Sequence, residues 1–218
     1  MSIRTLSELE DVMSGEFAWR KKELHSLKTL VIANEKTHSC DLHIRAAITL
    51  LYAHWEGFIR QISRFYLEYV ARRRLRNEEL SPHFLAMAIS GLVRAAEGTS
   101  KIQPCLDIVD FFRAEMPVRS RLDWESGVNT KSNLKSEVFR EIVLRLGLDY
   151  SRFSTKEKLL DEKLLKNRNQ IAHGQYLLVD FDEYVSLHEE ILGMMQDFYN
   201  QIDNCANLGA FRSTPQAV

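Results

Sequence analysis

Apolar side chains recur through residues 41–75 at alternating steps of four and three positions, and this periodicity constrains the fold more than any other feature of the chain. The repeat comprises Ile44, Ile48, Leu51, Trp55, Phe58, Ile62, Phe65 and Tyr69. On an α-helix such positions form one continuous stripe. The pattern predicts a single long helix from Asp41 to Leu75, packed against other helices of a bundle. A coiled coil between two chains is the less common use of the same stripe.

The remaining sequence also favours helices. Only four prolines and nine glycines interrupt 218 residues, a length that can bury one sizeable core. We expect further helices over residues 7–33, 83–96, 105–115, 135–146, 156–173 and 180–204. Capping boxes at Ser7–Glu10, Ser154–Glu157 and Asp180–Glu183 are expected to open three of them. The predicted fold is therefore all-α, with a single helical domain over residues 1–210 and a frayed tail at residues 211–218.

Charge and cysteine content restrict the class of protein. The formal net charge is −1, so any contact with RNA must come from local patches and not from overall charge. The three cysteines are odd in number and far apart, which fits a reducing compartment better than a disulfide framework. No signal-peptide core and no run of about 18 apolar residues is present. We therefore expect a cytoplasmic protein that does not span a membrane.

The segment Arg168-Asn169-Gln170-Ile171-Ala172-His173-Gly174 combines residue types suited to phosphate chemistry. At about 100° per residue, Asn169 and His173 share one face of a helix, and Arg168 lies at the border of the buried stripe. The stripe itself is expected to contain Leu160, Leu164 and Ile171. A histidine can transfer protons near neutral pH, and an arginine fork can bind two phosphate oxygens.

Two motifs together resemble a known family. The Arg168–His173 element resembles the Arg-(four to six residues)-His signature of the HEPN superfamily. The segment Tyr52-Ala53-His54-Trp55-Glu56-Gly57-Phe58 resembles the first core helix of the MAE-type HEPN branch. The two motifs occur in the family's order and span most of the chain. The resemblance implies a HEPN-like helical bundle with a long core helix and a C-terminal motif helix.

The resemblance also implies an activity. Many HEPN proteins are metal-independent endoribonucleases that act as homodimers, which would leave 2′,3′-cyclic phosphate ends and need no cofactor. By this resemblance Arg168, His173 and Asn169 are the candidate catalytic residues. One chain supplies a single histidine, so a complete acid–base pair requires two chains. The biological setting that the resemblance implies is bacterial defence, or a toxin restrained by an antitoxin or another partner protein.

Further residues are candidates for supporting roles. Glu56 either pairs with Arg60 one turn along the helix or faces the motif helix and orients Arg168 or His173. Arg72 and Arg73, at the end of the long helix, either form a solvated helix end or contact phosphate. Lys166, just before the motif, is a further candidate for RNA binding.

Other function classes are less well supported. The sequence contains no glycine-rich phosphate loop, and the spacing of His38, Cys40, Asp41 and His43 matches no standard zinc site. We therefore predict no metal. The main alternative to a ribonuclease is a non-catalytic HEPN module that binds RNA or a partner protein. An all-α structural protein without a nucleic-acid role is a third possibility.

Overall fold

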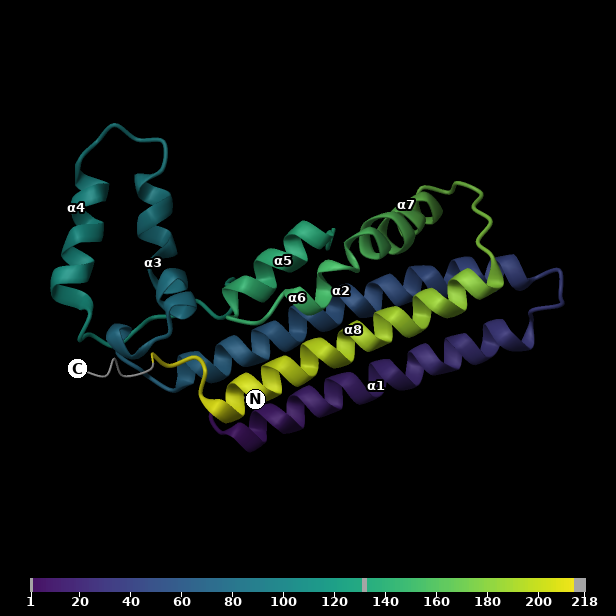
Figure 1. The fold of residues 1–218 in the computed structure, drawn as a ribbon, viewed down its shortest axis with the longest axis horizontal. Helices are drawn as coiled ribbons and strands as arrows, with labels where there is room; N and C mark the ends of the chain where they lie inside the picture. Colours follow the sequence, from purple (N-terminus) through teal and green to yellow (C-terminus); the bar gives the residue numbers. More distant parts are fainter. Residues whose placement is uncertain (1, 131–132, 214–218) are drawn as a thin grey trace.

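The computed structural model describes residues 2–130 and 133–213. Three long helices lie side by side and form the body of the molecule (Figure 1). They are α1 (Leu6–Ala33), α2 (Cys40–Arg72) and α8 (Phe181–Leu208). No strand occurs in the described part of the chain, so the predicted all-α fold is confirmed.

Shorter elements follow α2 and lie on one side of this three-helix layer (Figure 1). They are a 3₁₀ turn at Asn77–Glu79, α3 (Pro82–Ala96), α4 (Gln103–Asp110), a π-helical turn at Phe111–Glu115, α5 (Ser136–Arg145), α6 (Ser151–Ser154), a second π-helical turn at Leu159–Leu165 and α7 (Lys166–Ala172). Helix α7 packs against α2, and α3 and α4 form a hairpin that stands away from the layer.

The predicted stripe of α2 forms the centre of the core. Seven of its eight members are buried, and Phe65 is partly buried. Trp55 meets Phe139 of α5 edge-to-face, with ring centroids 4.9 Å apart, which ties the shorter helices to the long ones. The helix ends at Arg72 and not at Leu75 as predicted, because the chain turns at Arg74, whose φ is 58°.

Gly57 lets α1 approach α2 closely. A Cβ atom at this position would lie 2.9 Å from Nη1 of Arg20. The Arg20 side chain is held there by Glu16 at 2.6 Å and lies over the Trp19 ring at 4.4 Å. The glycine therefore makes room for a side chain of the neighbouring helix, which offsets its low helix propensity.

Two of the three predicted capping boxes are wrong, and the third, at Asp180–Glu183, forms only its N-cap half, because the Glu183 carboxylate pairs with Lys163. Helix α1 is opened by Thr5 and Glu8, because Thr5 Oγ1 accepts from the Glu8 amide and Glu8 Oε2 accepts from the Thr5 amide. At the second position, the Ser154 hydroxyl donates to the carbonyl of Ser151, and Glu157 pairs with Arg140. Glu157 and Lys158 are already helical, and the π-helical turn follows them from Leu159 to Leu165.

The last helix begins where predicted. Asp180 Oδ1 accepts from the amides of Asp182 at 2.9 Å and Glu183 at 3.3 Å, so the residue is a true N-cap. The helix then continues to Leu208, four residues beyond the predicted end near Asn204.

The predicted frayed tail at 211–218 begins too early. Phe211 is buried against Tyr69, and its carbonyl accepts from the Ser81 amide at 2.9 Å. The Ser213 amide donates to the carbonyl of Glu79. These contacts hold the chain after α8 onto the 3₁₀ turn. Residues 214–218 lie outside the described residues, and the single domain over 1–210 stays a prediction. Among the described helices, none combines the length and apolar character that crossing a bilayer demands.

Candidate active site

The motif helix is held on the core by leucines of the preceding π-helical turn. Leu160, Leu164 and Leu165 are buried, whereas Ile171 is only partly buried. A π-helical turn has a wider repeat than an α-helix, so it shifts the phase of the side chains that follow. This shift explains why Leu165 joins the buried stripe and Ile171 lies at its margin. Gly174, with φ of 74°, ends the helix directly after His173.

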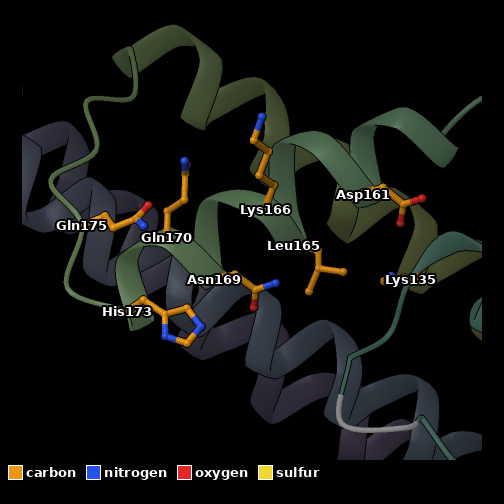
Figure 2. A pocket seen from close by; sticks show the side chains of 8 residues that line it. All are labelled: Lys135, Asp161, Leu165, Lys166, Asn169, Gln170, His173 and Gln175. Atoms are coloured by element: carbon orange, nitrogen blue, oxygen red, sulfur yellow. The ribbon is translucent and has the colours of Figure 1, made fainter.

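A pocket of about 460 Å³ opens along the exposed side of this helix (Figure 2). Most of its lining is polar or basic: Lys135, Asp161, Leu165, Lys166, Asn169, Gln170, His173 and Gln175. In Figure 2 the side chains of Asn169 and His173 extend from the same side of α7. The structure therefore brings Asn169, His173 and Lys166 together at one pocket.

Three of these side chains are free to meet a ligand. Within residues 2–130 and 133–213, the side chains of Lys166, Asn169 and His173 make no hydrogen bond or ion pair, and His173 is exposed. A proton-transfer group, an amide and a cation thus share a solvent-facing surface. Such a set can bind an anion and move a proton.

Asp161, by contrast, has a structural role in the pocket wall. Its Oδ1 accepts from the Ser136 amide at 2.8 Å, and its Oδ2 accepts from the Ser136 hydroxyl at 2.6 Å. The carboxylate therefore caps the start of α5 and fixes that helix to the π-helical turn. The residues that line the pocket still have a net positive charge, because Lys135 and Lys166 outweigh Asp161.

Arg168 lies outside this pocket lining. Its guanidinium carbon is 3.9 Å from the ring centroid of Tyr52 on α2, and its Nη2 donates to Asn133 Oδ1 at 3.1 Å. Its Nε is buried and has no hydrogen-bond partner among the described residues. The predicted approach of Arg168 from the border of the helix is thus directed toward α2, not toward Asn169 and His173.

Tyr52 links the two matched motifs. Its hydroxyl accepts from the Leu134 amide at 2.8 Å, and its ring supports Arg168. Burial raises the pKa of Tyr52, and the neighbouring Glu56 carboxylate raises it further. The hydroxyl is therefore protonated at neutral pH and serves as a fixed polar group beneath the arginine.

Glu56 makes neither of its two predicted contacts. Its Oε1 accepts from the Thr130 hydroxyl at 2.7 Å. No ion pair with Arg60 and no bond to Arg168 or His173 is formed among the described residues. Glu56 instead holds the Thr130 side chain.

Arg72 and Arg73 are remote from the pocket. They follow Tyr52 by about 20 residues on α2, a distance of roughly 30 Å along the helix axis. Arg72 pairs with Glu68 at 3.3 Å, and Arg73 donates to the carbonyl of Arg4. Arg73 thus fastens the end of α2 to the N-terminal segment, where a solvated helix end was one of the two predictions, and a phosphate contact by either arginine stays a prediction.

Lys135, Gln170 and Gln175 line the pocket but were not predicted from the sequence. Tyr52 belongs to the matched motif and supports Arg168, although it lies outside the pocket lining and was given no role. Gln170 lies inside the Arg168–Gly174 motif and Gln175 directly follows it, so their proximity was a usable signal. Lys135 comes from a separate helix start, and only the tertiary packing reveals it.

Comparison with known proteins supplies the family. A family model described as MAE_28990-like HEPN matches residues 9–211. No curated protein and no solved structure matches the chain. The match covers nearly the whole chain and includes both motifs. The protein therefore belongs to the MAE_28990-like HEPN family.

Proposed function

We propose that this protein is a metal-independent endoribonuclease that acts as a homodimer. The HEPN family includes ribonucleases, so membership supports a nuclease or RNA-related module. The observation that carries the finer proposal is the pocket on α7, where an exposed His173 and Asn169 stand beside Lys166 without partners inside the described chain.

The chemistry follows from these side chains. Cleavage without a metal requires a base that removes the 2′-hydroxyl proton, a donor that stabilises the growing charge on the phosphate, and an acid that protonates the leaving 5′-oxygen. His173 is the proton-transfer group, Lys166 attracts the phosphate, and Asn169 donates to a phosphate oxygen or orients the imidazole. The 2′-oxygen attacks phosphorus, and the products carry a 2′,3′-cyclic phosphate and a 5′-hydroxyl.

A second chain is needed to complete the reaction. Each chain contributes one histidine to the pocket, but base and acid must act on opposite sides of the phosphorus atom. A twofold dimer that brings two α7 helices together would supply two His173 side chains. In this arrangement one imidazole takes the proton from the 2′-hydroxyl and the other protonates the leaving oxygen.

Arg168 lies outside the pocket lining, on the side of α7 that faces α2. Its guanidinium is held by Tyr52 and Asn133, and the described residues give its Nε no partner. We propose that it donates to the RNA backbone when a substrate occupies the groove between two α7 helices. A guanidinium stacked on a ring keeps its remaining N–H groups in a fixed plane, which suits a phosphate.

The test is RNA cleavage by the purified protein in EDTA, with analysis of the product ends. His173→Ala should lower the rate by about a hundredfold or more, because general acid–base catalysis contributes that much. The matched control is His38→Ala, since His38 is an exposed histidine in the turn between α1 and α2. Equal cleavage by wild type and His173→Ala would overturn the proposal.

A non-catalytic module that binds RNA or a protein partner is the second candidate. The observation that favours it is the engagement of Arg168 by Tyr52 and Asn133, which gives the arginine a structural role in the isolated chain. This candidate predicts RNA binding that weakens with Lys166→Ala, together with no cleavage by wild type or variant.

The biological role that we propose is defence or toxicity inside a bacterial cell, restrained by a partner protein. An RNA-cleaving pocket that is open in the isolated chain would need such restraint. Expression of wild type should slow growth, and expression of His173→Ala should not. Equal growth in both cases would contradict a toxin role.

A further inference from the structure

A second hollow lies where α3 packs against α5, and its lining shares no residue with the motif pocket. It measures about 420 Å³ and lies between one side of α3, the turn at residues 123–127 and the end of α5. An adjoining hollow of about 280 Å³ shares Ala86, Met87 and Arg145 with it. The two hollows therefore form one groove, which we call the α3–α5 groove.

Much of the surface of the α3–α5 groove is apolar. Its α3 wall extends from His83 to Arg94, which is roughly 16 Å along the helix axis. Met87 and Val93 supply carbon surface from this wall, and Leu144 supplies it from α5. A concave surface of this kind binds a hydrocarbon or aromatic body, because contact with it removes apolar area from water.

Two glycines fix the walls of the α3–α5 groove. A Cβ atom at Gly127 would lie 2.4 Å from the carbonyl oxygen of Asp123, so a side chain there would break the turn that lies against Met87. Gly147 follows α5 with φ of 72°, and a Cβ atom there would lie 3.3 Å from the His83 ring. Both walls thus depend on a close approach that glycine permits, which keeps the groove in a defined shape.

Two guanidinium groups line the larger hollow of the groove. Arg94 is the only permanently charged residue of α3, and its Nε donates to the carbonyl of Ser90 at 3.3 Å. Arg145 is the last residue of α5 and lines both hollows. Among the residues that the structure describes, neither arginine forms an ion pair, and Arg145 also makes no hydrogen bond. Both side chains therefore keep N–H donors for an anion.

One carboxylate limits the charge that the groove can accept. The Ser126 hydroxyl and the Ser126 amide, the latter at 3.1 Å, both donate to Asp123, and these bonds lower the pKa of Asp123. Asp123 is therefore ionised at neutral pH and offsets one of the two arginines. The larger hollow keeps a formal charge of +1, which matches a monoanion better than a phosphate monoester with its charge of about −1.5 to −2.

We propose that the α3–α5 groove binds a small carboxylate with an apolar body. The carboxylate lies between Arg94 and Arg145, since a guanidinium fork can donate two hydrogen bonds to it. The apolar body lies along Met87 and Leu144 in the adjoining hollow. Acyl acids and aryl acids share this chemistry, and the experiment separates them. The proposal goes beyond the proposed cleavage and does not depend on it.

The experiment is a titration of the full chain, labelled with ¹³C at the methionine methyl groups, with octanoate and separately with phenylacetate. The NMR signal of Met87, assigned from Met87→Leu, should shift with at least one of the two acids, whereas that of the buried Met13 should not. Arg94→Gln and Arg145→Gln should each raise the Kd about tenfold, because each removes charged hydrogen bonds. The matched control is Lys22→Gln, which removes an exposed cation from α1 at the opposite edge of the layer and should leave the Kd unchanged (Figure 1).

Three further arms make the test specific. Ala86→Trp fills both hollows without a change of charge and should abolish the Met87 shift. Octylamine, which has the same body and a cationic head, should bind about tenfold more weakly than octanoate. Octyl phosphate should bind no more tightly than octanoate.

Four results would overturn the proposal: no Met87 shift with either acid, an unchanged Kd in both arginine variants, equal binding of octylamine, or tighter binding of octyl phosphate, which would assign the groove to phosphate esters. Because these readouts use no RNA, an absence of cleavage bears on the proposed function alone.

Discussion

The contact between Arg168 and Tyr52 joins the two family motifs at the scale of single residues. Tyr52 is buried on α2, Arg168 lies on α7, and their side chains meet at 3.9 Å from guanidinium carbon to ring centroid. The same tyrosine accepts a backbone hydrogen bond from Leu134. This aromatic side chain therefore adds to the buried leucines that hold the motif helix against the core helix.

Two substitutions of Tyr52 separate the role of its ring, which contacts Arg168, from that of its hydroxyl, which accepts from Leu134. Tyr52→Phe keeps the ring beneath Arg168 and should retain most of the cleavage rate. Tyr52→Leu removes the cation–π contact and should lower kcat/KM by roughly two- to thirtyfold, which corresponds to about 0.5–2 kcal/mol. Steady-state kinetics, with thermal unfolding of each variant as the control, makes the comparison. Equal loss in both variants would mean that the hydroxyl, not the ring, positions Arg168.

At the scale of elements, the caps decide where helices begin. Asp180→Ala should lower the free energy of unfolding by about 1 kcal/mol, because two amides at the start of α8 lose their acceptor. Asp182→Ala is the matched control, since this exposed acid lies in the first turn but is not the cap. Chemical denaturation measures both. A larger loss for Asp182→Ala would contradict the assigned cap.

The same scale shows what the sequence could predict. The steps of four and three in α2 are a property of one helix, so they were readable and are confirmed. The π-helical turn before α7 could not be predicted from the sequence, because an i to i+5 repeat has the same composition as an ordinary helix. The direction of the Arg168 side chain depends on Tyr52, more than 100 positions away, and the pocket role of Lys135 depends on packing. Catalytic roles at these residues stay predictions.

At the scale of the whole molecule, two buried histidines couple the fold to pH. Burial lowers the pKa of His188, whose Nε2 donates to the Leu24 carbonyl at 3.2 Å. Burial likewise lowers the pKa of His54. Both histidines therefore bind a proton less readily in the folded chain, even though His54 Nε2 lies 3.0 Å from Glu23 Oε2, so the unfolded chain binds more protons as the pH falls below about 6.5.

Stability should therefore be constant above about pH 7 and should fall as the pH is lowered toward 5. Each histidine contributes a slope of at most about 1.4 kcal/mol per pH unit. His188→Gln should reduce the slope of stability against pH, because glutamine does not titrate. Its amide can still donate to the carbonyl of Leu24, so the native contact is kept. Urea denaturation between pH 8 and pH 5 provides the comparison. An unchanged slope in the variant would show that His188 does not titrate in this range.

The most direct measurement of the central claim is cleavage by mixed dimers. Wild-type and His173→Ala chains are mixed in equal amounts, allowed to exchange subunits, and assayed in EDTA. If each site needs His173 from both chains, only wild-type dimers cleave, and activity falls to about a quarter of that of the same total amount of wild-type chain. Activity of about half would mean that each chain works alone, and it would contradict a composite site.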